Sequence, residues 1–517
     1  MNKPKHTNPT AIYSTADIRE IEQRAAALPN PPALMEKAGL AAAEVARDKL
    51  LIHDRTKVLV LAGPGNNGGD AFAVARHLRE WWFNVTLVFT GERTNLSDDA
   101  KRMLDAWLAA GGEILADIPK NEMWHAVIDG LFGIGLDLRQ GRDLKDNYLA
   151  LVNAVNRMNL PVLALDIPSG LGSDTGQVRG AAIRAAMTVT FIGLKPGLLT
   201  HHGPEYCGEI FLHDLDLDAG SLKEPMSWVM DQAYAQKWLP PPRSASSHKG
   251  MFGSIGIIGG STGMVGAALL AGTAALKLGA GRVYLGLIAD NAPGVDPAQL
   301  ELMLRPIHEL LKLDHLDCLV VGPGLGMSTD AHFYLNYALE SNLPLVLDAD
   351  ALNLISLHSG AAGLLRERLH ARSAPSILTP HAAEAARLLN TDTPTIQNDR
   401  MGAAANLTEN FNCYAVLKGA GSICAASGGK RYINTSGNPG LSSAGTGDIL
   451  SGIIGALLAQ GLHPKNALLL AVYLHGAAAD ALRNQHGGPL GMTASEIPNA
   501  ARSLLNQWIY NPAIQIT

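Results

Sequence analysis

One acidic residue, Asp448, stands among glycines and hydroxyl residues in the stretch NPGLSSAGTGDILSG at 438–452. An apolar run follows at once, which predicts a buried helix from Ile449 onward. The amides of 445–447 would converge at its N-terminus, where exposed N–H groups and the helix dipole bind anions. A carboxylate would repel phosphate, so it suits a base that takes a proton from a hydroxyl attacking a phosphoryl group. The alternative is that Asp448 has no catalytic role and is simply an acidic residue that the helix dipole stabilises at the N-terminus.

Three further motifs in the second half end strands with polar residues. LKGAGS offers Lys418 to a phosphate, and its glycines let the backbone close over a nucleotide. In TPHAAE, His381 could bind substrate or shuttle a proton, or be structural. In LDADALN, Asp348 and Asp350 could hold Mg²⁺ through water, or Asp350 could cap a helix.

The first half has its densest turn at AGPGNNGGD, residues 62–70. Pro64 excludes the dinucleotide fingerprint GxGxxG, and no GxxxxGK[ST] phosphate loop occurs. Asn66 and Asn67 offer carbonyl oxygens for a weakly held cation, while 68–69 offer amides for a phosphate. Asp129, Asp166 and Ser169 follow two more strands. Three strand ends could supply one cation with oxygens, or they could be three unrelated turns.

The elements that must position these residues alternate as strand and helix in both halves. TKVLVLAG, NVTLVFTG, HAVIDG, LPVLALD and MTVTFIG predict strands of the first half, and GSIGIIGG, RVYLGLI, DCLVVG, LPLVLD, SILTP and CYAVLKG strands of the second. Short alternating units of this kind predict an α/β fold with two doubly wound domains. The sites should lie at the carboxyl ends of the strands. We expect domains at 1–222 and 223–517, with a linker near 220–224.

Composition narrows the class of protein. The chain has 517 residues, 47% of them apolar, which predicts two well-packed domains. A net charge of −6 argues against nucleic acid as a partner. The N-terminus lacks an apolar signal region and no apolar run reaches 18 residues, so we expect a cytoplasmic protein without a membrane partner. Four cysteines without CxxC spacing are expected to be free buried thiols.

Together the motifs resemble known families. The second half resembles the ribokinase-like family and, within it, the NAD(P)H-hydrate dehydratases, through HKGMFGSIGIIGGS, GPGLG, LDADALN, TPHAAE, LKGAGS and the Asp448 segment in this order. The first half is similar to the NAD(P)H-hydrate epimerases, through LMEKAG, GPGNNGGD, DGLFGIG and DIPSG. The chain from about 11 to about 505 resembles the bacterial bifunctional NAD(P)H-hydrate repair enzymes, which implies a Rossmann-like three-layer first domain.

The resemblance implies a repair activity on reduced nicotinamide nucleotides that carry water at C6. The first domain would interconvert the R and S forms of NADHX and NADPHX. The second would dehydrate the S form, with ADP as phosphoryl donor giving AMP and phosphate. It also implies K⁺ in the epimerase domain and Mg²⁺ with ADP in the dehydratase domain.

Site residues carry over by motif. The catalytic residues implied are Asp448, as base on the C6 hydroxyl, and Asp166, as acid/base at the hydrate. Epimerase substrate positions are Asn66, Asn67, Gly68, Gly69, Asp70, Gly133, Ile134, Gly135, Leu136, Asp137, Leu138, Arg139 and Asp166. Dehydratase hydrate positions are Ala267, Gly324 with its rival Gly326, His381 and Asp448. Nucleotide positions are Lys418, Gly419, Ala420, Gly421, Ser422 and Gly447, and potassium ligands are Asn67, Asp129 and Ser169. Ala71 and Ala383 replace glycines common in relatives, which we expect to be mild changes.

Two alternatives remain at this stage. The second half could be a vitamin or sugar-alcohol kinase fused to an unrelated domain, or the first half could be a non-catalytic module. The chemistry of the residues alone does not choose ADP over ATP, or NADHX over NADPHX. Small-residue helices suit close packing, so we expect a homo-oligomer of unspecified order.

Overall fold

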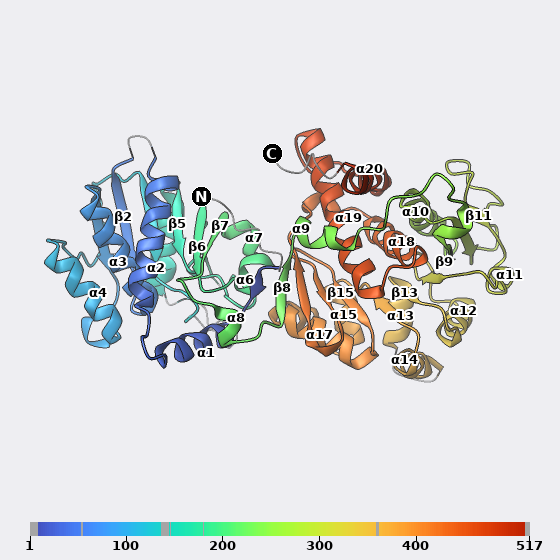
Figure 1. Cartoon of the computed structure of the whole chain (residues 1–517), viewed down its shortest axis with the longest axis horizontal. Helices are drawn as coiled ribbons and strands as arrows, with labels where there is room; N and C mark the ends of the chain where they lie inside the picture. Colours follow the sequence, from blue (N-terminus) through green and yellow to red (C-terminus); the bar gives the residue numbers. More distant parts are fainter. Residues whose placement is uncertain are drawn as a thin grey trace. The chain divides into compact units, whose positions relative to one another are not determined.

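The computed structural model describes residues 9–52, 55–135, 144, 146–178, 180–357 and 361–511. The chain divides into two compact units, residues 10–227 and residues from 228 onward (Figure 1). Each has a sheet and a hydrophobic core of its own. Residues 136–139 of the expected epimerase loop, Leu136, Asp137, Leu138 and Arg139, lie outside the described residues.

The first unit is built on a parallel sheet in the order β3-β2-β4-β5-β6-β7. Its strands are β2 (Lys57–Ala62), β3 (Asn84–Phe89), β4 (Ala126–Gly130), β5 (Val162–Leu165), β6 (Met187–Phe191) and β7 (Glu209–His213). Its helices are α1 (Thr15–Ala26), α2 (Leu34–Val45), α3 (Asn66–Glu80), α4 (Asp98–Ala109) and α5 (Asp146–Arg157), with short α6 (Pro196–Leu199), α7 (Gly203–Tyr206) and α8 (Ala219–Leu222).

Two layers of helices cover this sheet because its central strands are apolar on both faces. In β2, Val58 and Val60 join the core beneath α2, α3 and α4, while Leu59 and Leu61 face the core that includes α5. The strand order reverses between β2 and β4, which is where doubly wound sheets bind their ligands. The Rossmann-like three-layer architecture is therefore confirmed.

The second unit has a larger sheet in the order β8-β17-β16-β15-β14-β13-β12-β9-β10-β11, parallel from β15 to β11 and antiparallel through β15, β16 and β17. These strands are β8 (Ser227–Met230), β9 (Ser254–Gly259), β10 (Arg282–Leu287), β11 (Met303–Leu304), β12 (Cys318–Val321), β13 (Leu345–Leu347), β14 (Ser376–Leu378), β15 (Tyr414–Leu417), β16 (Ile423–Ala425) and β17 (Arg431–Asn434).

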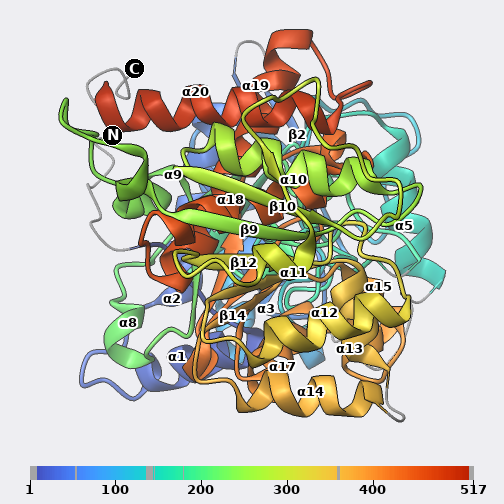
Figure 2. The same cartoon turned by 90° about the vertical axis from the view of Figure 1, so that its right-hand side faces the viewer.

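Helices again cover both faces of the second sheet (Figure 2). One layer is α10 (Val265–Lys277), α18 (Thr446–Ala459), α19 (Pro464–His486) and α20 (Ile497–Tyr510). The other is α12 (Thr329–Glu340), α13 (Asp350–Ser356), α14 (Ala361–Ala371), α15 (Ala382–Leu388) and α17 (Arg400–Phe411). Short helices α9 (Gln232–Ala235), α11 (Ile307–Leu310) and α16 (Thr393–Asn398) complete it.

The buried helix expected after Asp448 is α18, and glycine lets it approach its neighbours. A Cβ on Gly452 would lie 2.1 Å from the Ala271 carbonyl oxygen of α10, and one on Gly455 would lie 2.3 Å from Ile255 Cδ1 of β9. The close approach fixes α18, and with it Asp448, against the sheet.

The four cysteines, Cys207, Cys318, Cys413 and Cys424, are free and buried, as expected. Within the part of the chain that the structure describes, no helix combines the length and apolar character needed to cross a bilayer.

Candidate active sites

Asp448 is the third residue of α18, which begins after the left-handed N-cap Gly445 (φ 88°). The amides of Thr446 and Gly447 stand at the first two helical positions, where a helix offers them no acceptor. The pKa of the Asp448 carboxyl is raised to about 7, first by burial and then by the negative charge of Asp348. An amide cradle thus stands beside a carboxyl group poised to exchange a proton near neutral pH.

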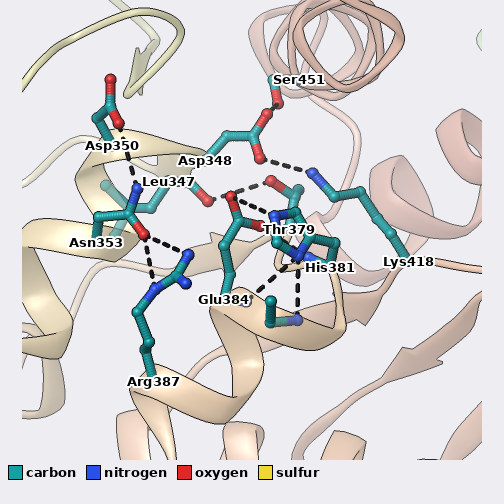
Figure 3. A network of polar contacts seen from close by, with 11 residues as sticks. Leu347, Asp348, Asp350, Asn353, Thr379, His381, Glu384, Arg387, Lys418 and Ser451 are labelled. Carbon is teal, nitrogen blue, oxygen red and sulfur yellow. Dashed lines mark hydrogen bonds and ion pairs between the residues drawn. The ribbon is translucent and has the colours of Figure 1, made fainter. Parts of the chain in front are cut away.

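A buried ion pair adds a positive charge to this cradle. Lys418 Nζ lies 2.9 Å from Asp348 Oδ1, and Ser451 Oγ of α18 donates to Asp348 Oδ2 at 2.7 Å (Figure 3). A Cβ on Gly447 would lie 3.2 Å from Lys418 Nζ. The lysine therefore reaches the helix N-terminus, where a side chain in place of Gly447 would crowd it. Burial raises the pKa of Asp348, but Lys418 and hydroxyl donors outweigh it and hold that pKa below its usual value.

The strand end of β13 fixes Asp348 and Asp350 by a strained backbone. Ala349 between them has φ 48° and ψ −117°, a conformation that L residues rarely adopt. Asp350 accepts hydrogen bonds from the Gly326 amide at 2.8 Å and from Asn353 at 3.2 Å. Asp350 is thus the first residue of α13, and its bond to Gly326 holds the turn after β12. The two acids therefore have different partners, since Asp348 pairs with Lys418.

His381 begins α15 as its N-cap. Its Nδ1 accepts the Ala383 amide at 3.1 Å, and the Glu384 carboxylate accepts the His381 amide at 2.8 Å (Figure 3). Burial, followed by the charge of Lys418, lowers the pKa of His381. Because Nδ1 accepts an amide, the ring proton is on Nε2, which lies 3.3 Å from Glu384 Oε1. Both ring nitrogens thus have partners within the turn, which supports the structural alternative and leaves substrate binding as a proposal.

The glycine loop after β15 adopts the backbone that its sequence predicts. Gly419 and Gly421 have φ of 142° and 60°, and the Gly419 amide donates to Ser422 Oγ at 3.2 Å. Ala420 lies between these glycines. Arg400, almost fully buried, donates to the Leu417 and Lys418 carbonyls beneath the loop. The loop is a preformed cradle at the same sheet edge as the Lys418 side chain.

The remaining hydrate positions of the second unit gather where its strand order reverses, between β9 and β12. Gly324 has φ 60°, and a Cβ built on it would lie 3.1 Å from the Ala267 Cβ at the start of α10. Gly326 faces Ser261 and donates to Asp350. The sequence motifs thus converge on one edge.

In the first unit, Asp129 and Ser169 form a buried pair. Ser169 donates to Asp129 from both its amide (2.8 Å) and its hydroxyl (2.7 Å), and burial raises the pKa of Asp129 to about 6. Neither polar atom of the buried Asn67 amide has a hydrogen-bond partner among the described residues. A buried carboxylate and an orphaned amide oxygen are both oxygen donors of the kind that fit a weakly held cation such as K⁺.

Asp166 lies at the end of the neighbouring strand β5. Its Oδ2 accepts the Ile134 amide at 3.2 Å, and a Cβ on Gly133 would come within 3.1 Å of that oxygen. Asp70 is close enough for Asp166 to raise its pKa, although burial is the larger cause. The loop at 133–135 therefore meets Asp166, and exposed Gly135 is the last of its described residues.

Three predicted positions in NNGGD make hydrogen bonds within the protein. Asn66 accepts a hydrogen bond from Ser97 at 2.8 Å, and the Gly68 and Gly69 amides donate to the Gly65 carbonyl at 3.0 and 3.3 Å. The two glycines serve packing, since a Cβ on Gly68 would lie 1.9 Å from the Gly63 carbonyl oxygen. Free phosphate-binding amides at these two residues are therefore not what the structure shows.

Sequence reasoning missed three groups that are buried or half-buried. Lys195 contacts Asp166, and Glu22 of α1 has its pKa raised by burial and then by Asp166. In the second unit, His475 of α19 interacts with the Thr446 backbone, and burial lowers its pKa to about 4. The signals available were a lysine in GLKPGL after a strand and a histidine inside an apolar helix.

Both sites are those of doubly wound α/β enzymes, with polar groups at the strand ends beside the reversal of strand order. A family profile described as NAD(P)H-hydrate dehydratase matches residues 255–502, and one described as YjeF-related protein N-terminus matches residues 32–197. The bifunctional NAD(P)H-hydrate repair enzyme of Escherichia coli is 38% identical over 98% of this chain and 96% of its own. That of Coxiella burnetii is 36% identical over 96% and 100%.

The chain belongs to the family of bifunctional NAD(P)H-hydrate repair enzymes. It combines an epimerase domain with a nucleotide-dependent dehydratase domain of ribokinase-like fold. The kinase and non-catalytic alternatives are thereby set aside. Among solved structures, an ADP/ATP-dependent NAD(P)H-hydrate dehydratase from Bacillus subtilis, co-crystallised with ATP/Mg²⁺, is 28% identical, with a TM-score of 0.48 over 54% of this chain and 98% of that one.

Proposed function

We propose that Asp448 is the base of an ADP-dependent dehydration of the S hydrates of NADH and NADPH. The observation that carries this is a carboxyl group with its pKa raised to about 7 in the first turn of α18, beside Lys418. Asp448 takes the proton of the C6 hydroxyl while the hydroxyl oxygen attacks the β-phosphoryl group of ADP, and AMP leaves. Phosphate then departs with the C6–O bonding pair, and a proton leaves C5 as its pair forms the C5=C6 bond.

Different groups of residues around Asp448 have different roles in that step. The 446–447 amides and Lys418 stabilise the charge on the phosphoryl group in transfer. The loop 418–422, with Gly419, Ala420, Gly421 and Ser422, and Gly447 hold the nucleotide. Ala267, Gly324, Gly326 and His381 hold the hydrate. These roles are supported by the convergence of the five strand ends.

Mg²⁺ would enter this site chiefly with the nucleotide. Asp348, Asp350 and Glu384 all accept hydrogen bonds from protein donors. Within the described residues, no group of three or more His, Cys, Asp or Glu side chains is placed to hold a metal. Phosphate oxygens and water are the usual remaining ligands of Mg²⁺.

In the epimerase domain, Asp166 acts as the acid/base on NADHX and NADPHX. It takes the C6 hydroxyl proton while the C6–N1 bonding pair moves to N1, which opens the ring to an aldehyde. Closure on the opposite face returns the proton to oxygen and gives the other epimer. Asn67, Asp129 and Ser169 would hold K⁺, which would supply a fixed positive charge at these strand ends.

The test is Asp448→Asn in the full chain. Turnover of purified S hydrate with ADP, followed by recovery of the reduced-nicotinamide absorbance, should fall by about 10²–10⁴-fold, the usual contribution of general base catalysis. ADP binding by calorimetry should persist, and R-to-S interconversion serves as the internal control. Retention of most of the dehydration rate would refute the role of Asp448.

Where the protein acts and how it assembles are also proposals. The proposed location is the cytoplasm, which cell fractionation would check. A homo-oligomer is proposed from the small-residue helices and would be checked by light scattering during size-exclusion chromatography.

A further inference from the structure

Lys195 is a buried cation that the reaction described so far does not use. Only 1% of its surface is exposed. Its ammonium group donates to Asp166 Oδ1, to Thr190 Oγ1 at 2.8 Å and to the Phe191 carbonyl at 2.9 Å. An ammonium has three N–H donors, so all three are satisfied inside the protein.

The backbone on both sides of this pair is strained in the same way. Asp166, after β5, has φ 65°, and the Ile167 amide donates to the Leu165 carbonyl at 2.7 Å. Ile192, after the adjacent strand β6, has φ 68°, and the Gly193 amide donates to the Phe191 carbonyl at 2.7 Å.

These are two γ-turns with a positive central φ, a rare and strained form, and Ile192 is β-branched. One turn carries the Asp166 carboxylate, and the other carries the carbonyl that accepts from Lys195. Strain of this kind is retained where it fixes a functional geometry.

The pair leaves Asp166 with one oxygen directed at the substrate loop. Oδ1 is occupied by Lys195, with Thr190 Oγ1 at 3.4 Å, whereas Oδ2 faces the Ile134 amide and Gly133. Glu22 and Asp70 contribute two further carboxyl groups, and Lys195 acts electrostatically on both. One lysine therefore offsets the mutual repulsion of three acids.

We infer that Lys195 is a positioning residue of the epimerase reaction, acting through Asp166. It holds one carboxylate oxygen and so presents the other to the C6 hydroxyl in a single orientation. The inference rests on the proposed acid/base role of Asp166. Because its own donors are satisfied within the fold, Lys195 does not bind the substrate directly.

The experiment is a double-mutant cycle in the full chain, with R-to-S interconversion measured in the absence of nucleotide. Lys195→Met should lower kcat by about 10²-fold with little change in KM, since a misplaced acid/base costs catalysis rather than binding. Lys195→Arg should recover part of that loss because it keeps the charge. In the Asp166→Asn background, Lys195→Met should cause no further loss, since both act as one unit.

Lys223→Met is the matched control, because Lys223 pairs with Glu20 of α1 at a partly exposed position. The inference is overturned if Lys195→Met keeps the wild-type kcat, or if it slows the Asp166→Asn enzyme by the same factor as the wild type. Should Lys195→Met alone fail to fold, Lys195→Arg decides, because it keeps the buried charge paired while moving the donor atoms, and a wild-type kcat in that variant would overturn the inference. An Asp166→Asn enzyme with full activity would instead refute the proposed role of Asp166.

Discussion

At the scale of the residue, the dehydratase site depends on the ionisation of one carboxyl group. Asp448 has its pKa raised to about 7, chiefly by burial, while Lys418 opposes the shift. A base must be ionised, so kcat/KM for the S hydrate should be flat above about pH 7 and fall about tenfold per unit below it. Rates from pH 5.5 to 8.5 with purified S hydrate would check this. A rate that stays flat down to pH 5.5 would contradict the burial effect.

The same shift makes a prediction about stability. Between the ordinary Asp value of 3.8 and about 7, the folded state holds a proton that the unfolded state has released. The free energy of unfolding therefore decreases as the pH rises through this window. Asp448→Asn should stabilise the dehydratase unit by about 1–2 kcal/mol at pH 8, after allowance for partial exposure, and by almost nothing at pH 4. Urea unfolding at both pH values would measure the difference.

At the scale of the element, the approach of α18 to α10 depends on Gly452. A Cβ there would lie 2.1 Å from a backbone oxygen of α10, which can move only with its helix. Gly452→Ala should destabilise the dehydratase unit by about 1–3 kcal/mol and lower its activity, with epimerisation unchanged. Gly488→Ala, where nothing lies within 4 Å, is the matched control. Equal stability of the two variants would contradict the packing argument.

Individual strands, helices and turns show which features of the fold and the sites can be predicted from the sequence and which cannot. The apolar runs of β2 and β9 and the GTGD segment predicted the strands, the buried helix and the placing of Asp448, because local pattern determines them. The roles of the Gly68 and Gly69 amides depended on helix register, which glycine spacing does not reveal. Lys195 was missed because its partners, Asp166 and Thr190, come together only when two strands pair and both end in γ-turns.

At the scale of the whole molecule, two units, each with its own sheet and hydrophobic interior, predict two cooperative unfolding transitions. Calorimetry should therefore resolve two transitions. ADP at 100 times its dissociation constant should stabilise one of them by about 2.7 kcal/mol and leave the other unchanged. A single transition that shifts as a whole with ADP would show that the units unfold together.

The buried cysteines also distinguish the units. Burial raises the pKa of the Cys207 thiol to about 12, and it raises the pKa values of the other three thiols as well. Maleimide reacts with exposed thiolate, so the native chain should resist alkylation. Cys207 belongs to the epimerase unit and the other three to the dehydratase unit. Each domain thus carries its own buried thiols as reporters of unfolding. Mass spectrometry of peptides after pulses of alkylation would measure the opening rate of each domain separately.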